Sequence, residues 1–80
     1  MILPGKHLGQ DRALLSIGAE ILEQLDEART VSGLWERVRL ARGSIAAPLS
    51  FDWFVLSLTF LYAVAAVEFA DDLVWARGEL

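Results

Sequence analysis

The sequence contains no cysteine and only one histidine, and these absences exclude several kinds of site. Without thiols there is no disulfide framework, no thiolate zinc site and no cysteine nucleophile. One imidazole excludes histidine-rich metal sites and leaves little for acid–base chemistry. No GxxxxGK[ST] phosphate loop occurs, and no spacing selects a Ser-His-Asp triad. We therefore expect no enzyme, no cofactor and no metal.

Positive charge is also scarce. Seven basic residues stand against eleven acidic ones, which gives a formal net charge of -4 and a pI near 4.7. A chain of this charge repels a phosphate backbone, which argues against an autonomous nucleic-acid binder. A local basic patch could still contact phosphates.

No apolar run is long enough to cross a membrane. The uncharged segment from Trp53 to Val67 would span roughly 22 Å as a helix, against a hydrocarbon core of roughly 30 Å. No lysine or arginine lies next to either end of it. The first residues show no charged leader followed by an apolar run, so we expect no secretory signal and a cytoplasmic protein.

What is abundant is apolar side chains. The 80 residues are 55 % hydrophobic and 22 % charged, with a mean hydropathy of +0.43. Soluble domains average about 45 to 50 % apolar, and so short a chain buries only about 60 % of its unfolded surface. The surplus therefore predicts contact with another protein rather than one closed core.

The apolar spacing predicts three helices. The i, i+3, i+4 pattern indicates a first helix over residues 11–27 capped by Asp11, and a second over 31–42 capped by Thr30. A third is expected over 51–66, capped by Ser50 with Asp52. Proline and glycine in residues 1–10 indicate a short strand or arm there, and residues 1–4 could add a strand to a sheet.

A hairpin follows the helices. Its predicted strands, 67–70 and 73–77, flank a turn at Asp71 and Asp72, which pairs Phe69 with Val74 and Val67 with Ala76 on one face. Glu68 then faces Trp75 on the other face. Three helices and a hairpin have the order of a winged helix. We expect one mainly α, α+β domain over residues 1–80, with a C-terminal wing and room for a short N-terminal strand.

The predicted third helix contains no Arg, Lys, Asn or Gln, the side chains that read base edges in the major groove. Sequence readout through it is therefore nearly excluded, and its aromatic content is typical of a protein interface. The alternative is that most of these residues form the core. The candidate protein-interface residues are Trp53, Phe54, Phe60, Tyr62, Leu73 and Trp75.

The basic residues offer a second candidate site. As a patch on and around the second helix, they could touch phosphates within an assembly, and the candidates are Arg29, Arg37, Arg39 and Arg42. The favoured alternative is that Arg37 and Arg39 pair with Glu36 and other carboxylates or are solvated. Lys6 and His7 have no assigned role.

Several stretches resemble one known family. They are Met1 to His7, Leu15 to Leu22, Thr30 to Trp35 and the helix from Ser50 to Ala63, and together they resemble the middle component 6 family of bacterial ABC-three-component systems. One departure is that Leu73 follows the acidic turn directly, where the family pattern leads us to expect a glycine.

The resemblance implies a non-catalytic adaptor. Such systems combine an SMC-like ABC ATPase, an effector such as a nuclease and a small middle component, in defence against phages and other invading DNA. The chain would then be part of a hetero-oligomer with those two proteins, touching nucleic acid only indirectly or weakly and no membrane. The alternative function is a small dimeric winged-helix DNA-binding transcriptional regulator. A peripheral membrane subunit is a weaker third reading.

Overall fold

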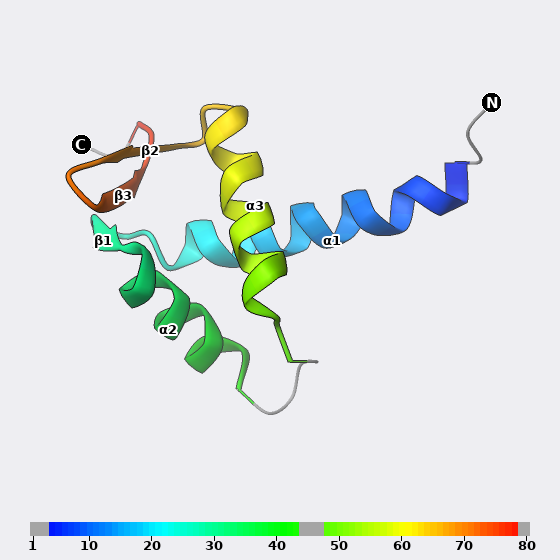
Figure 1. Ribbon diagram of the computed structural model, residues 1–80, viewed down its shortest axis with the longest axis horizontal. Helices are drawn as coiled ribbons and strands as arrows, with labels where there is room; N and C mark the ends of the chain where they lie inside the picture. Colours follow the sequence, from blue (N-terminus) through cyan, green and yellow to red (C-terminus); the bar gives the residue numbers. More distant parts are fainter. Residues whose placement is uncertain (1–3, 44–47, 79–80) are drawn as a thin grey trace.

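The computed structural model describes residues 4–43 and 48–78, which form three helices and a three-stranded antiparallel sheet (Figure 1). The expected mainly helical α+β class is confirmed, and the order of elements is that of a small winged-helix-like domain. The elements are α1 (Pro4–Glu23), β1 (Arg29–Thr30), α2 (Val31–Arg42), α3 (Phe51–Ala63), β2 (Val67–Ala70) and β3 (Leu73–Ala76).

The first helix is longer than expected and begins earlier. It starts at Pro4, and Asp11 lies inside it instead of capping it. Proline suits the first helical position, because the amide that it lacks would have no partner within the helix. The expected strand at residues 1–4 is therefore wrong at Pro4, and residues 1–3 lie outside the described residues. The third strand of the sheet is instead β1, which lies between α1 and α2.

The other two helices are capped by the residues that the sequence predicts. The Thr30 hydroxyl accepts a hydrogen bond from the Gly33 amide at 3.0 Å, and the Ser50 hydroxyl accepts one from the Trp53 amide at 3.2 Å. Each bond satisfies one amide of a first helical turn. Both helices therefore begin where their predicted caps placed them.

The third helix ends at Ala63, three residues before the expected end. Ala65 has a positive φ of 63°, and its amide donates to the Tyr62 carbonyl while the next amide, of Ala66, donates to the Leu61 carbonyl. This is the Schellman arrangement, which satisfies carbonyls of the last turn and stops the helix.

The predicted hairpin register is confirmed at all four pairs, from Val67 with Ala76 to Ala70 with Leu73. Asp71 and Asp72 have φ values of 53° and 65°, as both central residues of a type I′ turn require. Aspartate tolerates this left-handed region, so no glycine is needed before Leu73. The strand order β1-β3-β2 leaves β2 at one edge of the sheet.

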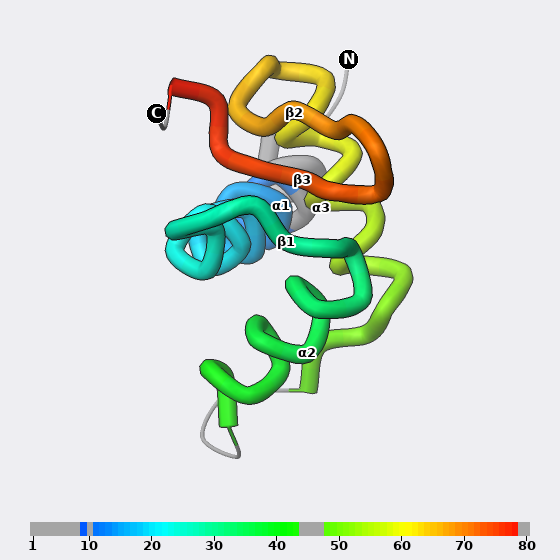
Figure 2. Tube along the Cα trace, turned by 90° about the vertical axis from the view of Figure 1, so that its left-hand side faces the viewer, coloured from blue at the N-terminus to red at the C-terminus, as the bar shows by residue number. Residues whose placement is uncertain are grey.

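The core lies where α1, α2, α3 and the sheet meet, and Figure 2 shows the sheet above α1 with α2 below. Helices α1 and α3 approach closely at Gly18, where an added Cβ would lie 3.3 Å from Leu61 Cδ2. A side chain at this position would therefore press against Leu61, which would have to shift. The buried hydrophobic residues are Ile17, Ile21, Leu25, Leu34, Val38, Phe54, Leu61, Val67 and Val74.

One polar group lies inside this core. The Ser57 hydroxyl on α3 is fully buried and has no hydrogen-bond partner among the described residues. A buried hydroxyl without a partner costs about 1–3 kcal/mol of stability. By contrast, the exposed Thr59 hydroxyl on the same helix donates to the Val55 carbonyl at 2.8 Å.

We expect Gly18→Val to lower the free energy of unfolding by about 2 kcal/mol, because the added methyl groups meet Leu61. Gly9→Val is the matched control, since a Cβ at Gly9 of the same helix meets nothing within 4 Å. Urea unfolding of both variants checks the difference. Equal stabilities of the two variants would show that α1 and α3 do not cross at Gly18.

We expect Ser57→Ala to raise the free energy of unfolding by about 1 kcal/mol, because it removes the unpartnered hydroxyl. Thr59→Val removes a partnered, exposed hydroxyl from the same helix and should leave stability unchanged or slightly lower. Thermal and urea unfolding measure both. A destabilised Ser57→Ala protein would mean that this hydroxyl has a partner.

Candidate protein-docking surface

An apolar surface runs along one side of α3 to the wing. Phe51, Val55 and Tyr62 lie on this side because their spacings of four and seven residues return to one face of a helix. Phe69 of β2 continues the surface onto the sheet. All four side chains are exposed, Tyr62 by 60 % and Phe69 by 50 %. These four residues are called the α3–β2 surface below.

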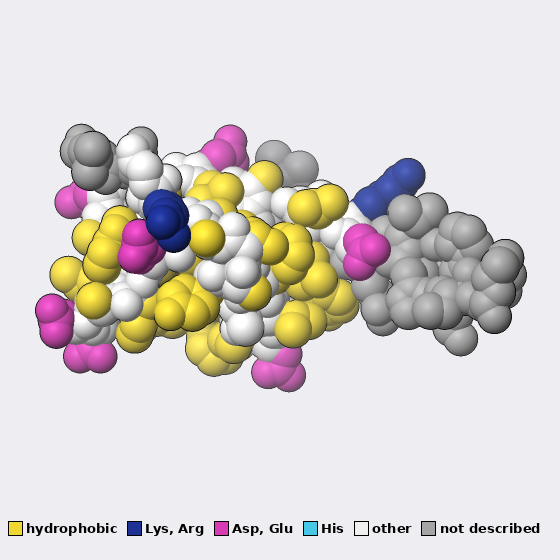
Figure 3. Space-filling view, turned by 90° about the horizontal axis from the view of Figure 1, so that it is seen from above, with side chains coloured by type: hydrophobic (Ala, Val, Ile, Leu, Met, Phe, Trp, Pro, Cys, Tyr) yellow, Lys and Arg dark blue, Asp and Glu magenta, His cyan; other side chains and the backbone are white. Residues whose placement is uncertain are grey.

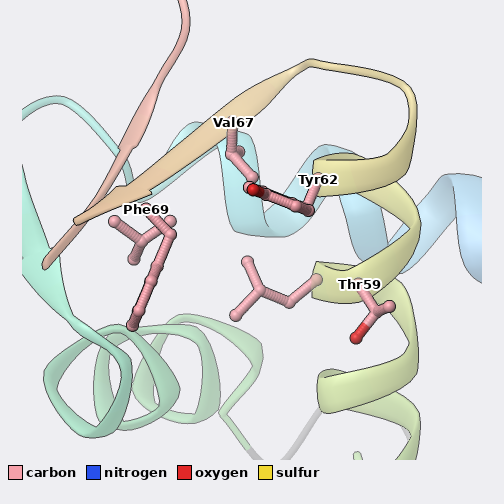
Figure 4. Close-up of a pocket in the computed structure, with 6 residues that line it drawn as sticks. Thr59, Tyr62, Val67 and Phe69 are labelled. Carbon is pink, nitrogen blue, oxygen red and sulfur yellow. The ribbon is translucent and has the colours of Figure 1, made fainter. Parts of the chain in front are cut away.

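The α3–β2 surface contains a hollow of about 200 Å³ between α3 and the sheet. Figure 4 shows Tyr62 and Thr59 reaching it from α3, and Val67 and Phe69 reaching it from the wing. Because the Thr59 hydroxyl is bonded within its own helix, the hollow presents mostly carbon. Its lining residues are Leu58, Thr59, Tyr62, Val67, Phe69 and Val74.

The opposite side of α3 carries a second apolar surface, next to α1. Phe60 of α3 and Leu14 and Leu15 of α1 line a second hollow there, with Asp11 at its margin. Leu15 is 60 % exposed, and Leu56 of α3 is 50 % exposed. These residues, without Asp11, are called the α1–α3 surface. The described residues of α3 therefore border two apolar surfaces on different sides of this helix.

The base of α3 is fixed against α2 by aromatic packing. The Trp35 ring meets Phe51 edge to face, with centroids 5.3 Å apart, and lies 5.0 Å from the Phe54 ring. The Arg39 guanidinium lies over the Trp35 ring, 5.7 Å from its centroid. This packing holds one end of the α3–β2 surface in place.

The structure does not bring the six candidate interface residues onto one surface. Phe54 is fully buried in the core, where it can only shape the surface through its neighbours. Trp53 and Phe60 are partly buried and pack against the core, and Tyr62 belongs to the α3–β2 surface. On β3, Leu73 and Trp75 lie on the sheet face opposite Val74, with Leu73 37 % exposed.

Sequence reasoning missed Phe51, Val55, Leu56 and Phe69 as surface residues. A signal was present, because 51, 55 and 62 recur at helical spacing on a side that does not include the buried positions 54, 57 and 61. The sequence predicts that Phe69 pairs with Val74 on one face of the hairpin, and the structure confirms this pair. Val74 on the central strand is buried, whereas Phe69 lies on the edge strand β2 and is 50 % exposed.

The four candidate phosphate contacts are mostly engaged with carboxylates. Arg39 pairs with Glu36 at 2.6 Å, and Arg42 donates to both Glu20 carboxylate oxygens at 2.7 and 2.9 Å. Of the four, only Arg37 forms no ion pair in the part of the chain that the structure describes.

Arg29 holds the loop between α1 and β1. Its Nη2 donates to Asp26 at 2.6 Å and its Nε to the Gln24 carbonyl at 2.8 Å, while Glu27 lies 3.5 Å away. Only 15 % of its side chain is exposed. The hydrogen bond from Arg29 lowers the pKa of Asp26, and the nearby Arg37 charge adds a smaller effect of the same sign. A phosphate would have to displace these carboxylates.

Other kinds of site are not evident over residues 4–43 and 48–78. Among the residues whose side chains the structure describes (9, 11–43 and 48–78), no group of three or more His, Asp or Glu is placed to hold a metal ion. No helix among them is long and apolar enough to cross a membrane. The two apolar surfaces are therefore the main features through which the described part of the chain can bind.

Comparison with known proteins gives one match. The family model for the ABC-three component (ABC-3C) system Middle Component 6 matches residues 3–77 of the 80-residue chain. No curated protein and no solved structure matches the chain.

We expect NMR titration to place the pKa of Asp26 below its ordinary value of 3.8 and Arg29→Gln to raise it, because the main hydrogen bond is lost. A lowered carboxyl pKa stabilises the fold above the ordinary value, and this contribution disappears as the pH falls through the lowered one. Arg37→Gln is the control and should raise the pKa less. An equal rise in both variants would contradict the Arg29 assignment.

Proposed function

The chain belongs to the Middle Component 6 family of ABC-three component systems, and we propose that it is the non-catalytic adaptor of such an assembly. In this proposal it bridges an SMC-like ABC ATPase and an effector such as a nuclease. The assembly would act in bacterial defence against phages and other invading DNA.

The observation that carries the proposal is the uncovered apolar surface of α3. Beyond Asp52, α3 has no charged side chain, and its own fold fully buries only the side with Phe54, Ser57 and Leu61, while Phe51, Val55, Leu56 and Tyr62 stay exposed. Contiguous exposed apolar surface on a small protein marks a contact with another protein. A chain that needs partners to cover its central helix is suited to be a subunit.

The two-sided arrangement supports a bridging role in particular. The α3–β2 surface and the α1–α3 surface lie on opposite sides of α3, so two different proteins could occupy them together. The hollows in both surfaces are lined mainly by hydrophobic side chains. Among the side chains that the structure describes, neither hollow brings together a nucleophile and a base within hydrogen-bonding reach, which supports placing the chemistry in other chains.

The charges support protein partners over direct DNA binding. Three of the four arginines near α2 are engaged with carboxylates, and the chain carries a net charge of -4. Each phosphate contact requires a free cation, and affinity for duplex DNA depends on several such contacts. The proposal therefore assigns any DNA contact to the other components.

The test is co-purification of the tagged chain with the other two components of its system, comparing single arginine substitutions. We expect Val55→Arg and Tyr62→Arg to reduce recovery of one partner at least about tenfold, because a charge would be buried in an apolar contact. Leu40→Arg is the matched control, since Leu40 is 75 % exposed on α2, outside both surfaces, and should leave recovery unchanged.

Two results would contradict the proposal. One is failure of the unsubstituted chain to co-purify with either component. The other is tight, salt-dependent binding of duplex DNA by the isolated chain, which would favour the DNA-binding regulator instead.

A further inference from the structure

The outer edge of β2 carries main-chain groups that the sheet does not use. In a hairpin with a two-residue turn, the flanking pair, here Ala70 and Leu73, exchanges hydrogen bonds, and bonded pairs then alternate along the ladder. Glu68 therefore bonds to β3 as well, and the Arg77 amide continues the alternation by donating to the Ala66 carbonyl at 2.9 Å. The N–H and C=O groups of Val67 and Phe69 consequently point away from β3.

This edge is open in the part of the chain that the structure describes. β2 pairs only with β3 there, and Glu68, Phe69 and Ala70 are exposed. Figure 3 looks down on this side of the molecule and shows apolar side chains spread over it, with acidic groups both among them and at the margin. The hollow of the α3–β2 surface lies beside the edge and is lined by Val67 and Phe69. A further strand bound here would form hydrogen bonds with the outward main-chain groups of β2, and its apolar side chains could enter the adjacent hollow.

The charges around the edge indicate what kind of strand would bind. Glu68 lies at the middle of β2, and Asp71 and Asp72 form the adjoining turn, while Arg77 is 3.7 Å from the Glu68 carboxylate. Three acidic side chains and one basic side chain therefore lie around the edge of β2, so the charge there is net negative. An extended segment with basic side chains between apolar ones would match this pattern.

A second copy of this chain fits the edge poorly. Two β2 strands paired antiparallel about a two-fold axis, through Val67 of one and Phe69 of the other, would place the two Glu68 side chains directly opposite each other. Like charges in this position destabilise a strand pair. Each copy also carries a net charge of -4.

We propose that the edge of β2 is a strand-addition site, where an extended, basic and apolar segment of another component of the assembly pairs with Val67 and Phe69. The inference rests on the proposed function, because the strand comes from a partner. The partner's apolar side chains enter the hollow next to Tyr62, and its basic side chains meet Glu68 and the acidic turn.

Amide hydrogen exchange, followed residue by residue in the isolated chain and in the complex with the other two components, tests the proposal. The amides of Val67 and Phe69 should exchange at least about tenfold more slowly in the complex, because they gain partners. The amides of Glu68 and Ala70 serve as internal controls, since β3 already binds them in the isolated chain.

Two variants of Phe69 distinguish the contribution of its main-chain amide to binding from that of its side chain. Phe69→Ala removes the ring and keeps the amide, whereas Phe69→Pro removes the ring and the outward N–H without removing a bond to β3. We expect Phe69→Pro to weaken the complex about two- to tenfold beyond Phe69→Ala, as one lost hydrogen bond would. Circular dichroism of both isolated variants confirms that the hairpin still folds.

The outcomes are distinguishable. A complex that forms while both amides still exchange freely would overturn strand addition and leave the adaptor proposal standing. Failure of any complex to form would overturn both. Slower exchange of both amides in the isolated chain at rising concentration would identify a second copy as the occupant and overturn the choice of partner.

Discussion

One buried stripe of α3 is the contact on which the other elements depend. Phe54 meets the Trp35 ring of α2, and Leu61 meets α1 where Gly18 allows the two helices to approach. The hairpin joins the same stripe through Val67 and Val74. Because one stripe of a single helix holds three neighbours, the remaining sides of α3 are uncovered. The fold and its exposed apolar surfaces thus have one origin.

The sequence correctly predicted the features that depend on residues close together in the chain, namely helix caps and hairpin pairs. The caps at Thr30 and Ser50 and the four hairpin pairs follow from side chains within a few positions, and all are present. The predicted beginning of α1 is wrong, because proline and glycine, which often break helices, are both accommodated in α1 at Pro4 and Gly9. Local sequence patterns therefore locate helix caps and turns, but they do not show whether a proline ends a helix or begins one.

The faces of α3 could not be ranked from the sequence. Hydrophobic periodicity identifies a buried side only when another side is polar, and α3 is apolar nearly all round. Phe54 and Tyr62 therefore looked alike as interface candidates, yet one is buried and the other is 60 % exposed.

The ion pairs of the arginines were also hard to predict from the sequence, because the partner of Arg42 is Glu20, 22 positions away. Only the packing of α1 against α2 reveals that pair.

The short connection between α3 and β2 has a mechanical consequence. The amides of Val64, Ala65 and Ala66 all donate to carbonyls of the last helical turns, and the Ala66 carbonyl accepts from Arg77 at the end of the hairpin. These bonds tie the end of α3 to the first residues of the wing. A push on the wing tip would be delivered to α3, and through its packing to α1, as a displacement of the whole body.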